Sequence, residues 1–242
     1  MSAITCIIPA FNEEKRIAEI LAVVVPLLST HLHEIIVVDD CSKDGTKPIV
    51  RTFSAVRLIE HAHNGGKSKT VSDAILASTG DFIFLLDADL KFLTEQNIID
   101  LLAPIQAGSA DLTISYRKNA WPLFPFTAID YLSGERVIAK SLVMPTIKAM
   151  AGLPSYGLEV FLNRIIIKNN LRIKVVEWPN VENDFNQHKH GWLKGLRIIV
   201  GVWLDVLSVV SIFEMYEQNY TMRKLMVENR QQKAPSACAK NG

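Results

Sequence analysis

The sequence has few cysteines and no paired cysteine motif. Its three cysteines, Cys6, Cys41 and Cys238, are odd in number and form no C-x-x-C pair. This usage argues against a disulfide framework or a zinc ribbon and fits a reducing compartment. The opening stretch "MSAITCIIPAFNEE" also lacks the basic segment and the apolar length of a signal peptide. We therefore expect a cytoplasmic protein.

The chain lacks an excess of charge of either sign and a long apolar run. Its formal net charge is +1, so nucleic acid is not an expected partner. The apolar runs near the C-terminus fall far short of the ~20 residues that a membrane-spanning helix needs. Yet 49% of the 242 residues are hydrophobic, which is rich for a fully soluble enzyme. A membrane surface and a homodimer interface therefore stay open as partners for part of this apolar surface.

Apolar runs alternate with helical patterns over the first half of the chain. Buried strands are predicted at Ile4–Ile8, Glu34–Val38, Val56–Glu60, Phe82–Leu86, 110–116 and Leu171–Trp178. Helices are predicted at 13–28, 44–53, 66–78, 94–105, Glu135–Met150 and Tyr156–Asn170. Pro26 should end or kink the first of these helices, and Thr94 should cap the helix at 94–105. Such alternation is typical of an α/β domain with a mostly parallel sheet.

Polar residues gather where the predicted strands end. The first four strands are followed by "PAFNEE", "DDCSKDGT", "HAHNGGKSK" and "DADL". In a doubly wound sheet, ligands bind at the carboxyl ends of the strands. Asp87 and Asp89 in "DADL" could form a solvated turn, because aspartate is common in turns. Asp87 and Asp89 could instead hold a divalent cation. Together with Lys67, which begins a helix on the opposite side, that cation could bind a diphosphate.

Four blocks, "PAFNEE", "VVDDCSKDGT", "NGGKSKTVSDAI" and "LLDADL", stand in an order and spacing that resembles the family 2 glycosyltransferases. The resemblance covers roughly residues 4–195. "LSGERVI" and "YGLEVFLNRI" are similar to acceptor-side segments of that family, including polyprenyl-phosphate sugar synthases and glucosyl-3-phosphoglycerate synthases. The resemblance to this family implies a GT-A fold, which is an α/β, Rossmann-like sandwich with a mostly parallel central sheet flanked by helices. Here a C-terminal apolar helix would follow it.

The resemblance and the change in composition together suggest a division of the chain. We expect a catalytic domain at 1–190, with a nucleotide-sugar half at 1–116 and an acceptor half at 117–190. A helical extension is expected at 191–228. The polar, small-residue-rich tail at 229–242 is expected to be disordered.

The resemblance also implies roles for individual residues on the donor side. The residues expected to contact the nucleotide are Pro9, Phe11, Glu13, Asp40, Gly66, Lys67 and Asp87. Among them, Asp40 would hydrogen-bond the base, and Lys67 would reach the base or the diphosphate.

On the metal and acceptor side, Asp89 would coordinate Mg²⁺ or Mn²⁺, with Asp87 as a second ligand. His188 or His190 would complete the metal site, and Glu159 would face the acceptor as a catalytic residue. Each assignment has a simpler alternative. The two histidines could be surface residues, and Glu159 could only stabilise the first turn of its helix.

A long apolar helix is expected from about Trp192 to Tyr216. Its polar positions recur every three or four residues and so form one narrow stripe: Lys194, Arg197, Gly201, Asp205, Ser208 and Ser211. A charge at its middle, Asp205, argues against a membrane span. The helix could pack on the sheet, line a dimer interface or lie in a membrane interface.

These observations predict a metal-dependent enzyme that moves a sugar from a UDP- or GDP-sugar to a polyprenyl phosphate on the cytoplasmic face of a membrane. A small soluble phosphorylated or hydroxyl acceptor is the alternative. A nucleotidyltransferase is disfavoured, because no glycine-rich loop ending in Arg and Lys follows the first strand. A non-catalytic nucleotide-sugar-binding protein is disfavoured by the presence of Asp87, Asp89 and Lys67 together.

Overall fold

The computed structural model describes residues 2–117, 133–154, 157–183, 201 and 204–231. Its centre is a seven-stranded sheet with the order β3-β2-β1-β4-β7-β6-β8. The strands are β1 (Ile4–Ala10), β2 (Glu34–Asp39), β3 (Arg57–Glu60), β4 (Phe82–Leu85), β6 (Leu112–Arg117), β7 (Arg136–Ala139) and β8 (Ile173–Trp178). Every neighbouring pair is parallel except those of β7, which runs antiparallel to both β4 and β6. The predicted α/β fold with a mostly parallel sheet is confirmed.

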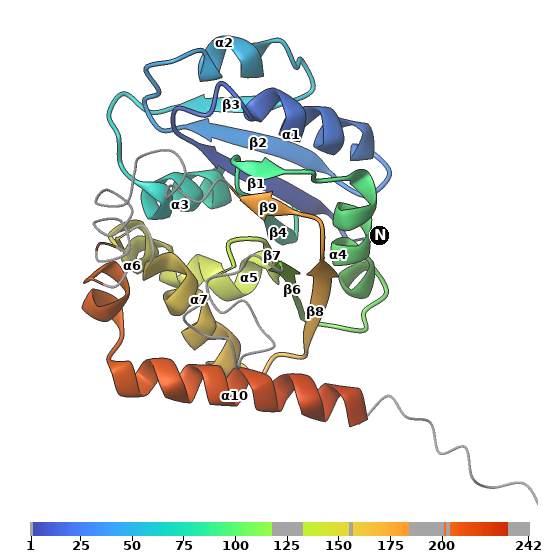
Figure 1. The fold of residues 1–242 in the computed structure, drawn as a ribbon, viewed down its shortest axis with the longest axis vertical. Helices are drawn as coiled ribbons and strands as arrows, with labels where there is room; N and C mark the ends of the chain where they lie inside the picture. Colours follow the sequence, from blue (N-terminus) through green and yellow to red (C-terminus); the bar gives the residue numbers. More distant parts are fainter. Residues whose placement is uncertain (1, 118–132, 155–156, 184–200, 202–203, 232–242) are drawn as a thin grey trace, which may run out of the picture.

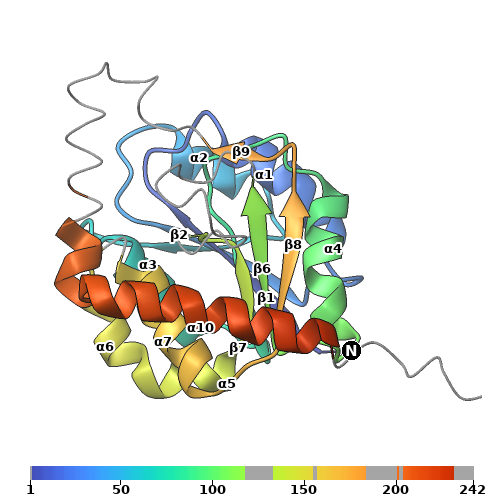
Figure 2. The ribbon, with the colours of Figure 1, turned by 60° about the horizontal axis from the view of Figure 1, so that its bottom comes forward.

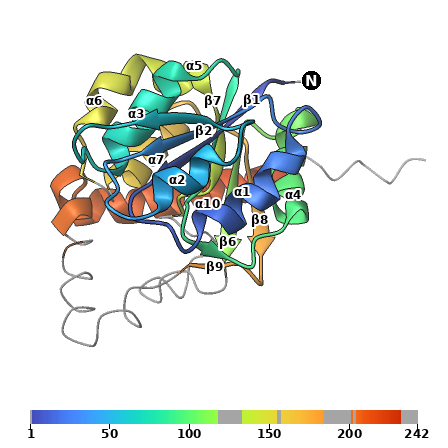
Figure 3. The same cartoon turned by 90° about the horizontal axis from the view of Figure 1, so that it is seen from above.

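Helices cover both faces of the sheet (Figures 1 and 3). One face carries α1 (Ile17–Val24), α2 (Thr46–Arg51) and α4 (Glu95–Gln106), and the other carries α3 (Lys67–Ala77), α5 (Lys140–Val143), α6 (Ile147–Ala151) and α7 (Gly157–Lys168). Successive strand residues point to opposite faces. In β2, Ile36 and Val38 therefore join one core, and Ile35 and Val37 join the other. Burial on both faces explains why these strands read as continuous apolar runs.

The strand β7 corrects the prediction of a helix over Glu135–Met150. Residues Arg136–Ala139 form the antiparallel strand, and only the residues after it are helical, in α5, a short 3₁₀ turn η2 (Met144–Thr146) and α6. Val137 and Ile138 belong to opposite cores, so they sit well in a strand that is buried on both faces. Pairing with β4 and β6 decided the conformation, because apolar spacing over so short a run fits a helix or a strand.

The ends of two helices follow the sequence signals. Pro26 lies in the 3₁₀ turn η1 (Val25–Leu27), so α1 ends at Val24, before the proline, as predicted. Thr94 caps α4: its hydroxyl accepts a hydrogen bond from the Asn97 backbone N–H, and the Asn97 side chain accepts one from the Thr94 N–H at 3.0 Å. This reciprocal pair is a capping box with asparagine as its second member.

The C-terminal region differs from the predicted single helix. Residues 204–209 are helical, and α10 (Ile212–Gln231) is a second helix that starts after a break at Val210 and Ser211. The Ser211 hydroxyl accepts a hydrogen bond from the Glu214 N–H at 3.1 Å, so it caps α10. The helix continues to Gln231 and so enters the tail that was predicted to be disordered. Residues 192–200 of the predicted helix lie outside the described residues.

The helix α10 crosses the end of the molecule against α7 and β8 (Figure 2). Met215, Met222 and Leu225 bury one side of it in the core, and Arg164 on α7 holds Glu214 in an ion pair. Phe213, Tyr216 and Tyr220 are exposed. Among the helices that could be searched in the described residues, none is long and apolar enough to cross a membrane.

A two-stranded antiparallel sheet lies beside the end of β4. It pairs β5 (Leu90–Lys91) with β9 (Glu182–Asn183), which follows β8 in the chain. The pairing fixes the chain just after Asp87 and Asp89, because β5 begins at the residue that follows Asp89. The segment after β8 is thereby brought next to the acidic turn (Figure 1).

Replacing Thr94 with alanine removes the hydroxyl that caps α4. We expect the free energy of unfolding to fall by about 1 kcal/mol, the usual cost of losing such a cap. Thr94→Ser keeps the hydroxyl and is the control. Denaturant unfolding followed by circular dichroism measures both, and equal stability of the alanine and serine variants would contradict the capping role.

Candidate active site

The predicted site residues lie at the carboxyl edge of the sheet. Pro9 is near the end of β1, Asp40 directly follows β2, and Asp87 and Asp89 follow β4. Lys67 is the first residue of α3, which follows β3, and Glu159 is in the first turn of α7. The topology therefore gathers residues that are far apart in the sequence at one edge, where α/β sheets bind ligands.

The loops after β1 and β2 lock together through side-chain bonds to backbone groups. The Asn12 N–H donates to the Ser42 hydroxyl at 2.9 Å, and the Lys43 N–H donates to the Asn12 side chain at 2.8 Å. The Glu13 N–H donates to the Thr46 hydroxyl at 2.8 Å. Phe11 projects from this rigid pair of loops with 45% of its surface exposed. An exposed ring on a fixed loop is suited to stacking against a flat ligand such as a base.

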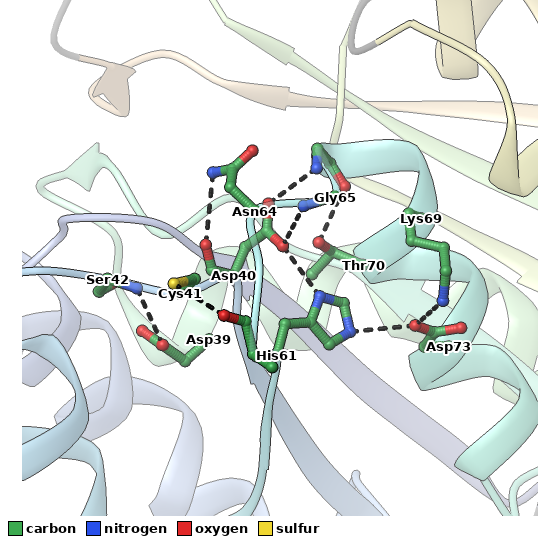
Figure 4. A network of polar contacts seen from close by, with 12 residues as sticks. Asp39, Asp40, Cys41, Ser42, His61, Asn64, Gly65, Lys69, Thr70 and Asp73 are labelled. Atoms are coloured by element: carbon green, nitrogen blue, oxygen red, sulfur yellow. Dashed lines mark hydrogen bonds and ion pairs between the residues drawn. The ribbon is translucent and has the colours of Figure 1, made fainter.

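The Asp40 carboxylate holds the glycine turn that leads into α3 (Figure 4). Its oxygens accept hydrogen bonds from the N–H groups of Gly65 and Gly66, each at 2.8 Å, and from Nδ1 of His61 at 2.8 Å. Burial by itself raises the pKa of Asp40, but the Gly65 N–H, the His61 ring and the Gly66 N–H together lower it below the usual range. Gly66 has a φ of +81°, which is a conformation that favours glycine.

His61 continues this network, and the sequence argument missed it. Its Nε2 lies 3.0 Å from a carboxylate oxygen of Asp73 on α3, and Lys69 also pairs with that carboxylate. His61 therefore stands between two carboxylates, one after β2 and one on α3. Asp40 was predicted to bind the base of a nucleotide. In the structure most of its hydrogen-bonding capacity is used to shape the turn beside it, and that prediction remains untested.

Lys67 joins the two acids expected on the metal and acceptor sides. Its ammonium lies 2.8 Å from Oδ1 of Asp87 and 3.0 Å from Oε1 of Glu159. Burial lowers the pKa of Lys67, but the two carboxylates outweigh burial and raise it above the ordinary value. Glu159 is almost fully buried, with 4% of its side chain exposed, and its second oxygen, Oε2, is buried and has no hydrogen-bond partner among the described residues. One acceptor atom of Glu159 is thus available inside the site.

Asp87 and Asp89 have different electrostatic environments although they are one residue apart. Burial raises the pKa of Asp87, but Lys67, then Arg117 and Arg136, lower it below its usual range. For Asp89, burial and the charges of Asp87 and Glu135 raise the pKa to about 6. Lys67 and Arg117 act in the opposite direction on the pKa of Asp89 but do not outweigh burial and the two neighbouring acids.

This pair of carboxylates suits a magnesium-like ion. Such ions are commonly held by one or two carboxylates, with water and substrate phosphates as the other ligands. Asp87 and Asp89 supply those carboxylates, and the raised pKa of Asp89 shows a carboxylate that a cation would stabilise. Within the described parts of the chain, no three His, Cys, Asp or Glu side chains converge as metal ligands. His188 and His190, predicted as the third ligand, lie outside the described residues.

A buried polar network supports the acidic turn from below. Oε2 of Glu135 accepts hydrogen bonds from the hydroxyls of Ser115 and Ser133, each at 2.8 Å, and Oε1 lies 3.4 Å from Arg117. Arg136 is fully buried and donates to the Asn163 side chain at 3.2 Å. The guanidinium groups of Arg117 and Arg136 also lie close enough to Asp87 to lower its pKa. Neither arginine has a predicted role, because the sequence predicts a strand that ends at Tyr116 and a helix that includes Arg136.

Gly134 lies so close to Asp87 that any other residue type here would require the Asp87 carboxylate to shift. A Cβ atom at position 134 would stand 2.5 Å from Oδ2 of Asp87 and 2.9 Å from its Cγ. The glycine stands just before β7, so the position of this strand next to β4 brings its backbone onto the carboxylate. The sequence singled out "LSGERVI" as an acceptor-side segment, but gave no sign of this contact.

We expect Gly134→Ala to destabilise the protein by about 1–3 kcal/mol, the usual range for forcing a methyl group into a filled space. Gly152→Ala is the matched control, because the nearest atom to its Cβ would be 3.9 Å away. Denaturant unfolding of both variants tests the expectation. A Gly134→Ala variant as stable as Gly152→Ala would show that the Asp87 carboxylate moves aside freely.

Several known proteins are similar to this chain in sequence or in fold. The family model described as Glycosyl transferase family 2 matches residues 5–121. A dolichyl-phosphate beta-glucosyltransferase from Dictyostelium discoideum is 28% identical over 131 residues, which cover 48% of this chain and 40% of that protein. A dolichol-phosphate mannosyltransferase from Pyrococcus furiosus is 32% identical over 130 residues, covering 50% and 36%. The chain thus spans well under two thirds of the length of these relatives.

Among solved structures, the fold is similar to that of glucosyl-3-phosphoglycerate synthase from Mycobacterium tuberculosis. A complex of that enzyme with Mn²⁺, uridine diphosphate and glucosyl-3-phosphoglycerate superposes with a TM-score of 0.69 at 21% identity, covering 86% of this chain and 80% of that one. A complex with Mg²⁺ and uridine diphosphate gives 0.68. At this identity the likeness supports the fold alone. Residues 5–121 match the model of glycosyl transferase family 2, the family that the four sequence blocks resemble.

Proposed function

We propose that the protein transfers a sugar from a UDP- or GDP-sugar to an acceptor that carries a phosphate, with Mg²⁺ or Mn²⁺ as cofactor. One observation carries the proposal: the carboxylates of Asp87 and Asp89 stand at the carboxyl end of β4, with the Lys67 ammonium 2.8 Å from Asp87. Such a site offers anions to a divalent cation and a cation to a diphosphate. The matching family and the ligands named for the similar synthase structures support this reading.

The proposed reaction gives a role to each residue around Asp87 and Asp89. Phe11, Pro9 and Glu13 hold the base and ribose, beside the turn that Asp40 fixes. Lys67 binds the diphosphate, and Asp87 and Asp89 bind the metal ion. The metal ion supplies Lewis-acid stabilisation of the charge that develops on the leaving nucleotide diphosphate.

A phosphate-bearing acceptor fits the buried cations. Arg117 and Arg136 lie close enough to Asp87 to lower its pKa, so positive charge surrounds the point where the sugar would be transferred. Their side chains are buried and paired with Glu135 and Asn163, so they act on the acceptor through their charge. A polyprenyl phosphate is our first choice, since several curated relatives act on dolichyl or dolichol phosphate according to their names. Its attacking oxygen is already ionised and needs no strong general base.

A small soluble phosphorylated acceptor is the second candidate. The similar synthase structures include complexes with phosphoglyceric acid, and the similarity extends over 86% of the chain. Transfer to a hydroxyl group requires a base to take its proton. Glu159 is placed for this role, because its unpartnered Oε2 atom is buried in the site beside Lys67.

The exposed apolar side chains near the C-terminus support a peripheral position on a cytoplasmic membrane face. Leu204, Leu207, Phe213, Tyr216 and Tyr220 are all exposed. On α10 the three aromatic residues are spaced so that they share one side of the helix. Aromatic residues on one side of a surface helix favour the membrane interface. The same surface could pair two copies of the chain, and sedimentation with and without vesicles separates the two cases.

We expect Asp89→Asn to reduce sugar transfer by about 100-fold or more, because a site that loses a metal ligand loses several kcal/mol of charge stabilisation. The measurement is release of nucleotide diphosphate from a nucleotide sugar in the presence of Mn²⁺. Asp81→Asn is the matched control: Asp81 is exposed and precedes the same strand, at its opposite end. Transfer that survives both Asp89→Asn and EDTA would exclude the metal-dependent mechanism.

The variant Glu159→Gln separates the two acceptor classes. We expect it to slow transfer to a hydroxyl acceptor by about 100-fold or more, the usual contribution of general base catalysis, and to slow transfer to a phosphate oxygen much less. The measurement compares polyprenyl phosphate with 3-phosphoglycerate as acceptors for the same variant. Loss of the Glu159 charge beside Lys67 affects both reactions equally, so the ratio of the two effects reports the base role. Equal slowing of both would exclude Glu159 as the base.

A further inference from the structure

Lys67 lies where it holds two acids of the site at once. Its ammonium is 2.8 Å from Asp87 and 3.0 Å from Glu159, and 26% of its side chain is exposed. Asp87 also has Gly134 pressed against it, so its carboxylate has little room to turn away from Lys67. A cation that binds Asp87 would therefore use either Oδ1, which Lys67 already contacts, or Oδ2, which lies close to Gly134.

An ammonium and a divalent cation that share the Asp87 carboxylate repel each other, so the presence of Lys67 weakens the binding of the metal ion. Two unit charges about 4 Å apart already interact by about 4 kcal/mol at an effective dielectric of about 20, and a doubly charged ion doubles this. Lysine is also able to leave, since its charge is carried on a flexible four-carbon chain. Its backbone stays in place meanwhile, because Asp40 holds the preceding Gly65 and Gly66.

We propose that Lys67 is a gate for the metal site: it occupies Asp87 until a nucleotide diphosphate draws its ammonium away, and the metal ion then takes its place. This inference rests on the proposed function, because it assumes that a diphosphate and a divalent cation bind here. Its consequence is that the metal ion binds weakly by itself and tightly together with the nucleotide. Lys67 then opposes the binding of metal alone, although it supports the binding of the nucleotide.

The test is titration of the full chain with Mn²⁺ and no nucleotide, with free Mn²⁺ measured by electron paramagnetic resonance. We expect Lys67→Gln to bind Mn²⁺ about tenfold more tightly than the parent, because the competing charge is gone. The amide of glutamine is neutral but can still donate hydrogen bonds, so this variant removes the charge and keeps a polar group near the two acids. Lys67→Met should show the same gain, and Lys67→Arg, which keeps the charge, should show none.

Two further variants test whether the tighter Mn²⁺ binding of Lys67→Gln arises at Asp87. Lys168→Met removes the same charge at the far end of α7, about 13 Å along the helix from Glu159, and should bind Mn²⁺ like the parent. The double variant Lys67→Gln, Asp87→Asn should lose the gain, because Asp87 is the ligand that Lys67 blocks. Two results would overturn the proposal, because each would show a general effect of charge. One is tighter Mn²⁺ binding by Lys168→Met, and the other is tighter Mn²⁺ binding that persists in the double variant without Asp87.

Repeating the titration with UDP present separates this inference from the proposed function. In the parent we expect UDP to strengthen Mn²⁺ binding, and in Lys67→Gln we expect a smaller strengthening. If UDP or GDP with Mn²⁺ does not bind to the parent at all, the proposed function fails. If they bind, but Lys67→Gln and Lys67→Met bind Mn²⁺ alone no better than the parent, only the gate is overturned.

Discussion

The Lys67 ammonium is the contact on which the rest of the site depends. Asp87 and Glu159 come from different layers of the fold, one from the end of β4 and the other from the start of α7. The two carboxylates repel each other, and the Lys67 ammonium between them offsets this repulsion. The sheet, α3 and α7 are thereby joined at the point where chemistry is proposed. Asp89, which has less positive charge around it, keeps a raised pKa.

The position of Lys67 depends in turn on Asp40. Its carboxylate fixes the N–H groups of Gly65 and Gly66, and these residues set the start of α3. His61 connects the same carboxylate to Asp73, one and a half turns further along α3. A small network of charges therefore positions a helix rather than only one side chain. This explains how Lys67 can have a flexible side chain and a fixed backbone position.

The antiparallel strand β7 contributes as much as the parallel strands do. It lies between β4 and β6 in the sheet, and this position delivers Gly134, Glu135 and Arg136 to the underside of Asp87. A wholly parallel sheet would bring only strand ends to this edge. Here the beginning of one strand meets the ends of its neighbours, so a buried arginine can lie beneath an acidic turn.

The sequence by itself determined the parallel strands, the cap at Thr94, the resemblance to glycosyl transferase family 2 and the group of residues at the carboxyl edge of the sheet. Those features depend on local pattern: apolar runs, capping residues and the polar residues that follow each strand. Only the tertiary structure decided that Arg136–Ala139 is a strand, that Ser211 divides the C-terminal helical region, and that His61, Gly134, Arg117 and Arg136 belong to the site. Strand pairing, charge and close contact between distant segments decide such features. They are properties of neighbours in space, which a short stretch of sequence does not record.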